Sequence, residues 1–387
     1  MINTPCFVIN KDDLDNNVFS FQKALKEQWG NGILSYSVKT NSLPWLLEYM
    51  LKNGARAEVV SSCEYQLARK IGFSQDNIVF NGPVKGKEEF LDALENGAII
   101  NIDSQREIEW LEEAAPSLDF DRAVGVRVNF SIEDICKGDI GWEEDGTRFG
   151  FSYETGALEE TIKRINAIPH IHVGGLHMHV VNLTRKVFVY QTLARTAAEI
   201  IRKYNLDVEY VDIGGGFFGG VPGKPTFNEY VSAIRAELVP TVDPEKTALI
   251  VEPGSAISAS PMDFVVTVVD VKDTVKARMV TVDGSRCNID PLLLKHNYLH
   301  EVEADGEVYS GKQIVCGFTC MDKDRIIEFT DYPELKVGDR IIFHKIGAYS
   351  MQMNPLFISF YPTVYLKDGE EYSVVRRAWT PDDFLIK

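Results

Sequence analysis

The chain has 387 residues, of which 45% are hydrophobic and 25% charged, so general disorder is excluded and two to three domains of roughly 150 residues each are expected. A net charge of −17 argues against nucleic acid, whose phosphates attract basic proteins. No apolar run approaches the roughly 18 residues of a membrane span, no signal peptide is visible at the start, and the six cysteines form no CxxC pair. We therefore expect a cytoplasmic protein with reduced thiols, without nucleic-acid or membrane partners.

From about residue 30 to 255, short apolar runs alternate with segments of helical periodicity. Helices are predicted at 45–53, 63–71, 87–96, 105–115 and 186–204. Eight strands are predicted, at 33–39, 57–61, 77–81, 99–103, 123–129, 172–180, 209–213 and 248–252. Eight strands with crossover helices match an α/β fold of the (β/α)8 barrel type, with a doubly wound sheet as the alternative.

The pattern changes after about residue 260, just before Pro261. Short alternating strands separated by turn residues are predicted at 263–272, 277–283, 312–316, 325–329, 338–343 and 363–366. Long helical periodicity is absent there. We therefore expect a separate C-terminal antiparallel β domain over residues 261–387.

Polar residues stand at the ends of the predicted barrel strands, and these ends would face an active site. They are Lys39, Glu58, Asn81, Asp103, Arg127, His179, the run Gly214-Gly215-Gly216, and Glu252. Taken singly, each has an ordinary explanation as a solvated lysine, a core histidine, a helix cap or a turn. Taken together, a glycine run that admits a phosphate and a lysine able to form a Schiff base indicate pyridoxal 5'-phosphate (PLP).

A metal site is not expected. His177 and His179 would share one face of a strand, which is compatible with metal binding, but no cysteine or carboxylate pattern accompanies them.

Six segments, in order along the chain, resemble motifs of the fold type III PLP-dependent amino-acid decarboxylases, which include diaminopimelate, ornithine and carboxynorspermidine decarboxylases. The segments are Ser35-Tyr36-Ser37-Val38-Lys39-Thr40-Asn41, Gly175-Leu176-His177-Met178-His179, Asp212-Ile213-Gly214-Gly215-Gly216-Phe217, Val251-Glu252-Pro253-Gly254, Cys316-Gly317-Phe318-Thr319-Cys320-Met321-Asp322-Lys323-Asp324, and Gly338-Asp339 with Gly347-Ala348-Tyr349. The resemblance implies an alanine racemase-like fold, in which a barrel over residues 11–260 is joined to a β domain of residues 261–387 and the N-terminal strand 1–10.

The resemblance also implies residue roles. Lys39 would bind PLP covalently, His179 would stack on its ring, and Glu252 would keep the pyridine nitrogen protonated so that the ring accepts the electrons left by CO2. The remaining positions implied to hold the cofactor are Gly214, Gly215, Gly216 and Tyr349 at the phosphate, with Glu58 and Arg127 in support.

Cys320 would return a proton to the substrate carbon after CO2 leaves. In the family this cysteine enters the site from the partner subunit. A head-to-tail homodimer with shared active sites is therefore implied.

The substrate positions depart from the diaminopimelate decarboxylase pattern. Ser255 and Asp290 stand where that enzyme has arginine, and Met321 replaces an acidic residue. A bidentate arginine is not replaced conservatively by serine or aspartate, so meso-diaminopimelate is not expected as the substrate. The Gly-Ser pair usual near His179 is here Val181-Asn182.

Three residues are candidate substrate ligands, each with a solvated surface position as the alternative. Arg286 would supply a compensating clamp for a carboxylate, and Asp290 and Asp322 would suit a distal amine. The sequence leaves open the substrate, its stereochemistry and the pathway, for which polyamine and siderophore synthesis are candidates.

Two other functions remain as alternatives. An amino-acid racemase of this fold would carry arginine in place of Glu252 and would lack the Cys320 motif. A non-catalytic regulatory relative would have lost cofactor ligands, whereas Lys39, His179 and Tyr349 are all present. A PLP-dependent carboxy-lyase is therefore favoured.

Overall fold

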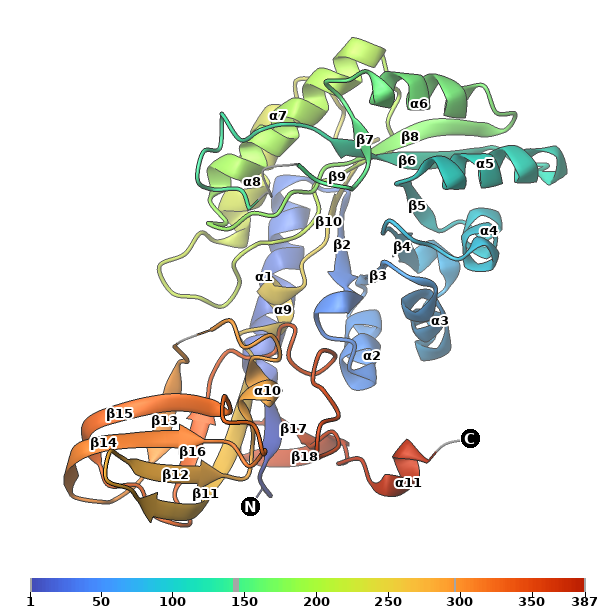
Figure 1. Ribbon diagram of the computed structural model, residues 1–387. Coiled ribbons are helices and arrows are strands. Elements are labelled where there is room, and N and C mark those ends of the chain that lie inside the picture. Colours follow the sequence, from blue (N-terminus) through green and yellow to red (C-terminus); the bar gives the residue numbers. More distant parts are fainter. Residues whose placement is uncertain (1, 142–145, 296, 386–387) are drawn as a thin grey trace. The chain divides into compact units, whose positions relative to one another are not determined.

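The computed structural model describes residues 2–141, 146–295 and 297–385. The chain divides into two compact units (Figure 1). We call them the barrel unit, Asn17–Lys39 with Leu46–Ala256, and the sheet unit, Met1–Asn16 with Thr40–Trp45 and Ile257–Lys387. Each is described by itself.

The barrel unit contains eight parallel strands that close on themselves. They are β2 (Gly32–Ser37), β3 (Arg56–Val59), β4 (Ile78–Phe80), β5 (Ile99–Ile102), β6 (Arg122–Asn129), β8 (Ile171–His177), β9 (Tyr210–Asp212) and β10 (Ala248–Val251). Closure is made by β10 and β2, where Leu249 pairs with Gly32. The short β7 (Phe151–Ser152) pairs parallel with the end of β6. The (β/α)8 barrel is confirmed, and the open doubly wound sheet is excluded by this closure.

The hydrophobic periodicity predicts five of the helices that accompany these strands, and the structure adds four more among the residues that it describes. Together they are α1 (Lys11–Gln28), α2 (Pro44–Lys52), α3 (Ser62–Ile71), α4 (Lys87–Glu95), α5 (Gln105–Ala114), α6 (Ala157–Asn166), α7 (Val187–Tyr204), α8 (Phe227–Leu238) and α9 (Ser255–Ser258). The sequence itself sets some of their ends. Ser61 caps α3 by accepting the Glu64 N–H, and Thr226 and Glu229 form a reciprocal capping box at α8.

Most barrel strands end one to three residues earlier than predicted, and two of these ends matter for the site. β2 stops at Ser37, and Lys39 lies in a 3-10 turn, η1 (Val38–Thr40). β8 stops at His177, so the prediction that His177 and His179 share one strand face is wrong. The side chains of Lys39 and His179 therefore take their directions from the turns beyond the strands.

The barrel interior contains an apolar layer with little spare room. Val79, Tyr210, Ala248 and Ile250 form a buried cluster. A Cβ on Gly175 would lie 2.2 Å from the Tyr210 ring, so this position needs glycine for close packing. The Tyr210 hydroxyl donates to the Asn101 carboxamide oxygen at 2.9 Å, which satisfies a buried polar group.

The sheet unit is built on a nine-stranded sheet. Its strands are β1 (Cys6–Asn10), β11 (Met262–Asp273), β12 (Arg278–Val282), β13 (His300–Glu303), β14 (Val308–Cys316), β15 (Arg325–Pro333), β16 (Arg340–Phe343), β17 (Thr363–Asp368) and β18 (Glu371–Arg376). The N-terminal β1 pairs antiparallel with β11 and parallel with β17. Its side chains are almost wholly buried, which explains why this segment belongs to the sheet.

The expectation of a purely antiparallel β domain is wrong in two places. β1 runs parallel to β17, and β12 runs parallel to β14. Strands β13 and β18 were also missed by the sequence pattern, because both are rich in charged and exposed residues and lack a clear apolar alternation. Short helices α10 (Arg286–Ile289) and α11 (Pro381–Phe384), with the 3-10 turns η2 (Gln75–Asn77) and η3 (Ala115–Ser117), complete the described elements.

Among the described residues, no helix combines the length and apolar character that crossing a membrane requires.

Candidate active site

Polar side chains gather at the carboxyl ends of the barrel strands. The parallel strands bring these ends to one face of the barrel, which is where barrel enzymes place their chemistry. The side chains come from η1 and from the ends of β3, β4, β6, β8, β9 and β10, and they are Lys39, Glu58, Asn81, Arg127, His177, Asp212 and Glu252.

Lys39 is held by a buried carboxylate. Its Nζ lies 2.7 Å from Oε2 of Glu58, whose side chain is only 1% exposed, whereas the lysine side chain is 40% exposed. Glu58 also accepts hydrogen bonds from the Ser37 hydroxyl at 2.6 Å and the Asn81 amide at 3.1 Å. The contact with Glu58 thus orients the Lys39 amine, and the lysine side chain remains accessible to a ligand.

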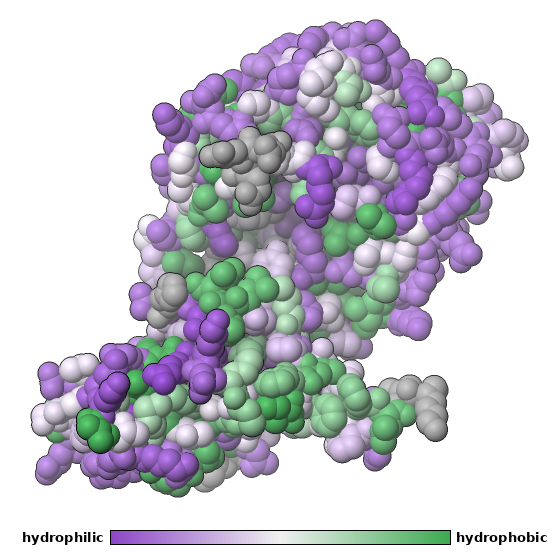
Figure 2. Space-filling view, in the orientation of Figure 1, coloured by the Kyte–Doolittle hydropathy of each residue, from purple (hydrophilic) through white to green (hydrophobic). Residues whose placement is uncertain are grey.

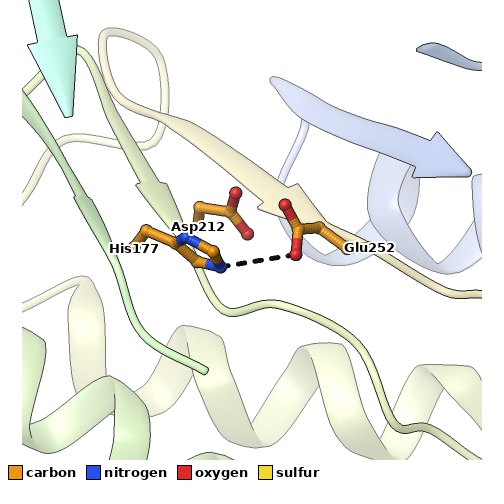
Figure 3. Close-up of side chains that lie close together, drawn as sticks. All are labelled: His177, Asp212 and Glu252. Atoms are coloured by element: carbon orange, nitrogen blue, oxygen red, sulfur yellow. Dashed lines mark ion pairs between the residues drawn. The ribbon is translucent and has the colours of Figure 1, made fainter. Parts of the chain in front are cut away.

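Glu252 lies at the centre of a buried cluster with His177 and Asp212 (Figure 3). Oε2 of Glu252 lies 3.4 Å from Nε2 of His177, and the Asn81 amide donates to Oε1. Burial alone would raise the pKa of the Glu252 carboxyl. The surrounding His177, Asp212 and Lys39 outweigh burial and lower the pKa, so this carboxylate stays ionised.

Asp212 behaves in the opposite way. It is fully buried, its Oδ1 accepts the Gly214 N–H at 2.8 Å, and it is hydrogen-bonded to Glu252. Burial, followed by the charge of Glu252, raises the pKa of Asp212 well above its usual range. The two neighbouring carboxyl groups therefore differ in protonation.

The imidazole of His179 is neutral. Burial, followed by the charge of Arg127, lowers its pKa well below that of an ordinary histidine. Arg127 holds this segment in place, because its Nη2 donates to the His179 carbonyl oxygen at 2.9 Å. A neutral imidazole can stack on an aromatic ring without the solvation penalty of a buried charge.

The glycine run after β9 forms a cradle that side chains would fill. Gly214 and Gly216 have φ values of 71° and 88°. A Cβ on Gly215 would lie 2.3 Å from the Glu252 carbonyl oxygen, and one on Gly214 would lie 2.5 Å from the His179 Nδ1. Glycine is therefore required here, and the missing side chains leave room for an anion beside the backbone, although the Gly214 and Gly215 N–H groups already donate to Asp212 and His179.

The neighbouring loop adds a polar atom that has no partner. Nδ2 of Asn182 is buried and makes no hydrogen bond within the chain, while its Oδ1 accepts the Arg185 N–H at 2.7 Å. Arg185 in turn donates to the Phe217 carbonyl oxygen at 3.3 Å, just after the glycine run. A bound phosphate would supply the acceptor that Asn182 lacks.

These residues fit PLP. The donor set is an accessible amine for the aldehyde, a neutral ring for stacking, an ionised carboxylate for the pyridine nitrogen and a glycine cradle for the phosphate. His177, Asp212 and Glu252 also lie within 4.8 Å of one another, as metal ligands do. However, the N–H groups of Gly214 and Asn81 already occupy lone pairs of the two carboxyl groups and would compete with a cation.

The remaining predicted site residues lie in the sheet unit. Cys320 and Asp322 are exposed on the loop that follows β14. The buried carboxylate of Asp324 fixes this loop, because it accepts the Thr319 hydroxyl at 2.6 Å and the Arg286 N–H at 2.8 Å. One carboxylate thus places the cysteine loop beside α10.

Arg286 and Asp290 are engaged with each other. Nη2 of Arg286 lies 3.1 Å from Oδ2 of Asp290. The same carboxylate accepts the Tyr298 hydroxyl at 2.9 Å and the N–H groups of Leu294 and Lys295 at 3.1 and 2.9 Å. Asp290 therefore organises its own loop and has little capacity left for a ligand.

Tyr349 is 45% exposed and adopts a left-handed backbone conformation with φ of 56°. Its N–H donates to the Thr40 carbonyl oxygen at 2.9 Å, the residue directly after Lys39. Backbone strain of this kind is often kept where a side chain must point in one direction.

Sequence reasoning assigned no role to Asp212 and considered His177 only as a metal ligand. Both lie inside motifs that were recognised, two residues before Gly214 and before His179 respectively. The available signal was the conjunction of three titratable residues at the ends of consecutive strands β8, β9 and β10. The separation of these three residues along the sequence does not show which of their side chains are in contact.

Comparisons with known proteins agree with this geometry. Residues 13–259 match the pyridoxal binding domain of pyridoxal-dependent decarboxylases, and residues 187–347 match the C-terminal sheet domain of the same enzymes. A probable chloroplastic diaminopimelate decarboxylase of rice (Oryza sativa subsp. japonica) is 27% identical, over 99% of this chain and 79% of the rice protein. An L-glutamyl-[BtrI acyl-carrier protein] decarboxylase of Niallia circulans is 25% identical, over 99% of this chain and 93% of that protein.

Solved structures share the fold. Diaminopimelate decarboxylase of Helicobacter pylori, complexed with L-lysine, superposes with a TM-score of 0.84 at 23% identity, covering 99% of this chain and 96% of that one. The arginine decarboxylase of Paramecium bursaria Chlorella virus gives a TM-score of 0.77 at 19% identity, with 95% and 96% covered.

Proposed function

This chain belongs to the pyridoxal-dependent decarboxylases and uses PLP, and from that premise we propose that it removes the α-carboxylate of an amino acid other than meso-diaminopimelate. The observation that carries the proposal is the cluster around Lys39, His179 and Glu252, which supplies an accessible amine, a neutral ring and an ionised carboxylate.

PLP, when bound, supplies an electron-accepting ring conjugated to the substrate's α-carbon. The chain supplies the rest. Glu58 orients the Lys39 amine through their 2.7 Å contact, and the glycine cradle leaves room for the phosphate. Glu252, kept ionised in a buried site, favours a proton on the pyridine nitrogen and so supports the electron-accepting state.

The substrate proposal rests on the lack of an arginine at two positions, 255 and 290, where a guanidinium would bind a distal carboxylate. Ser255 opens α9 directly after Glu252, Pro253 and Gly254, and a serine hydroxyl cannot clamp a distal carboxylate as a guanidinium does. Asp290, which stands at the second arginine position, is saturated by contacts within its own loop. Of the three candidate substrate residues, only Asp322 is exposed, and we propose it as the group that meets a distal amine.

The test is release of CO2 from a panel of L- and D-amino acids. We expect meso-diaminopimelate to be decarboxylated at least tenfold less efficiently, as kcat/KM, than the best substrate of the panel. Ser255→Arg should improve meso-diaminopimelate relative to that substrate. A wild-type preference for meso-diaminopimelate would contradict the substrate proposal and leave the decarboxylase assignment intact.

We further propose that Cys320 protonates the product carbon in the active site of a partner subunit within a homodimer. Cys320 is exposed on its own unit, as a residue that serves a neighbouring subunit must be. The sheet unit also exposes large apolar side chains, among them Met353, Leu356, Phe357, Ile358, Tyr372 and Val374. Figure 2 shows hydrophobic surface on this unit. Exposed patches of this kind mark protein–protein interfaces.

The oligomeric state is measured by size exclusion with light scattering. We expect a mass of two chains for the wild type, and a shift toward the monomer for the double variant Phe357→Glu with Val374→Lys. An unchanged monomeric mass for the wild type at micromolar concentration would overturn the dimer proposal.

A further inference from the structure

Asp212 and Glu252 form a pair of buried carboxyl groups that the charges around them do not neutralise. Asp212 is wholly buried and Glu252 is 5% exposed. Their oxygen atoms lie within 4.8 Å of each other and of His177 (Figure 3). Two ionised carboxylates at this distance in a dry site repel strongly, and pairs of this kind share a proton.

The neighbouring cations act on the pair but are shared with other carboxylates. Lys39 is paired with Glu58 at 2.7 Å, and the charge that stabilises Arg127 most is that of Asp103. His177 does not supply a cation, because burial and then the charge of Arg127 lower its pKa. Lys39 and Arg127, set against Glu58, Asp103 and the two carboxyl groups of the pair, leave a net charge of −2, which a proton on one carboxyl group reduces to −1.

The hydrogen bonds indicate which of the two groups has an oxygen available for the proton. Oδ1 of Asp212 accepts the Gly214 N–H at 2.8 Å, and Oδ2 receives only a long 3.4 Å contact from the Asn101 amide. The Asn101 amide is better placed on the Asn81 oxygen, at 2.8 Å. Oδ2 is therefore free to carry a proton and to donate it to Glu252, whereas Glu252 already accepts from Asn81.

We propose that Asp212 is a positioning residue that stays protonated and donates a hydrogen bond to Glu252, which fixes the ionised carboxylate that faces the pyridine nitrogen of PLP. The proposal rests on the proposed function in that it assigns Glu252 to this nitrogen. It adds a neutral aspartic acid, held behind the ionised glutamate, to the residues that set the electronic state of the cofactor.

The direct test is infrared spectroscopy of the holoenzyme and of the PLP-stripped protein at neutral pH. A protonated carboxyl group gives a carbonyl stretch that is separate from the amide bands and moves in D2O. We expect this band in both samples, with a further shift when aspartate, but not glutamate, is labelled with ¹³C at the side-chain carboxyl. Its loss in Asp212→Asn assigns it to this residue. Absence of the band, or its persistence in Asp212→Asn, would overturn the proposal.

Two variants give a second readout through cofactor retention. Asp212→Asn keeps both hydrogen bonds, since an amide can accept from Gly214 and donate to Glu252, and we expect PLP affinity within about threefold of wild type. Asp212→Leu has a similar size but no donor, and we expect PLP affinity to fall on the order of tenfold to a hundredfold. If Asp212→Asn is as impaired as Asp212→Leu while both remain folded by circular dichroism, the aspartate acts through its charge and the proposal is wrong.

These measurements separate the inference from the proposed function. The infrared band and PLP affinity do not depend on turnover. A protein that shows the band but decarboxylates no amino acid would retain the inference and lose the proposed function.

Discussion

The Nζ atom of Lys39 and the Oε2 atom of Glu58 lie 2.7 Å apart, although the lysine is part of a turn beyond β2 and the glutamate lies within β3. Glu58 is almost wholly buried and has a second and third donor in Ser37 and Asn81, so its position does not depend on the lysine. The amine is therefore presented at a fixed place before any ligand arrives, which is the preorganisation that covalent cofactor attachment needs.

Lys39→Ala should abolish covalent PLP attachment, because no other amine occupies this position against Glu58. Borohydride reduction of the wild type followed by peptide mapping should place the pyridoxyl group on Lys39. Lys87→Ala, which removes an exposed lysine that pairs with Glu113, is the matched control and should leave labelling unchanged. Recovery of the label on a different lysine of the wild type would refute the assignment.

Glu252→Gln should retain PLP and slow decarboxylation on the order of a hundredfold or more, because an amide cannot stabilise a proton on the pyridine nitrogen. The change is measured as kcat at saturating substrate, with bound PLP quantified by absorbance. Glu209→Gln, at an exposed position on a neighbouring segment, serves as the control. A wild-type kcat in Glu252→Gln would show that another group partners the nitrogen.

Acid should destabilise the fold through the buried histidines. The folded-state pKa values of His177 and His179 lie below 6.5, the ordinary value, chiefly because of burial. As pH falls below 6.5, the unfolded chain binds protons that the folded chain does not. The free energy of unfolding therefore falls, by up to about 1.4 kcal/mol per pH unit for each histidine.

Urea unfolding at pH 7.5 and pH 5.5 measures this dependence. His179→Asn, whose amide oxygen can still accept the Gly215 N–H, should show a smaller loss of stability on acidification than the wild type. His170→Asn, at an exposed position, should behave like the wild type. Equal pH dependence in all three proteins would contradict a depressed His179 pKa.

The ion pair of Lys85 and Glu107 should be needed for stability rather than for chemistry. Nζ and Oε2 lie 2.8 Å apart, both side chains are fully buried, and Lys85 also donates to the carbonyl oxygens of Gly82 and Asn101 at 2.9 and 3.0 Å. Glu107→Gln leaves a buried ammonium without its counter-charge, so we expect a loss of about 3–5 kcal/mol in the free energy of unfolding.

The double variant Lys85→Met with Glu107→Leu should recover part of this loss, because it removes both charges together. Glu159→Gln, which breaks an exposed pair with Lys163, should leave the melting temperature unchanged. Melting curves of the wild type, Glu107→Gln, the double variant and Glu159→Gln test this expectation. A Glu107→Gln protein as stable as the wild type would mean that Lys85 is neutral in the folded state.

A mixture of Lys39→Ala and Cys320→Ala subunits tests whether the active site is shared. If Cys320 serves the partner's site, each mixed dimer contains one intact site and one doubly defective site. Random exchange makes about half of the dimers mixed, so roughly a quarter of wild-type activity should return. The readout is the amine product, because water can protonate the carbon in place of Cys320. No recovery, with subunit exchange verified, would place the cysteine within its own chain.

The sequence by itself determined the barrel and the approximate places of its chemistry. Alternating apolar runs and helical segments specify strands and helices locally, and eight strands with helices between them leave few architectures other than a closed parallel barrel. Lys39, Glu58 and Glu252 were recognisable because parallel strands bring their carboxyl ends to one face whatever the sequence between them.

Contacts between these residues were decided only by the tertiary structure. Asp212 contacts Glu252, and β1 runs parallel to β17, so both contacts join segments far apart in the chain. The contacts of Asp290 with Tyr298 are local, but they depend on the path of the loop after α10. Spacing along a sequence determines on which face of a strand a side chain lies. The distances between side chains depend on the twist of the sheet and on the turns beyond the strand ends, and their electrostatic interactions depend also on burial. Protonation follows from those quantities, so the division of roles between two adjacent carboxyl groups becomes readable only once the chain is folded.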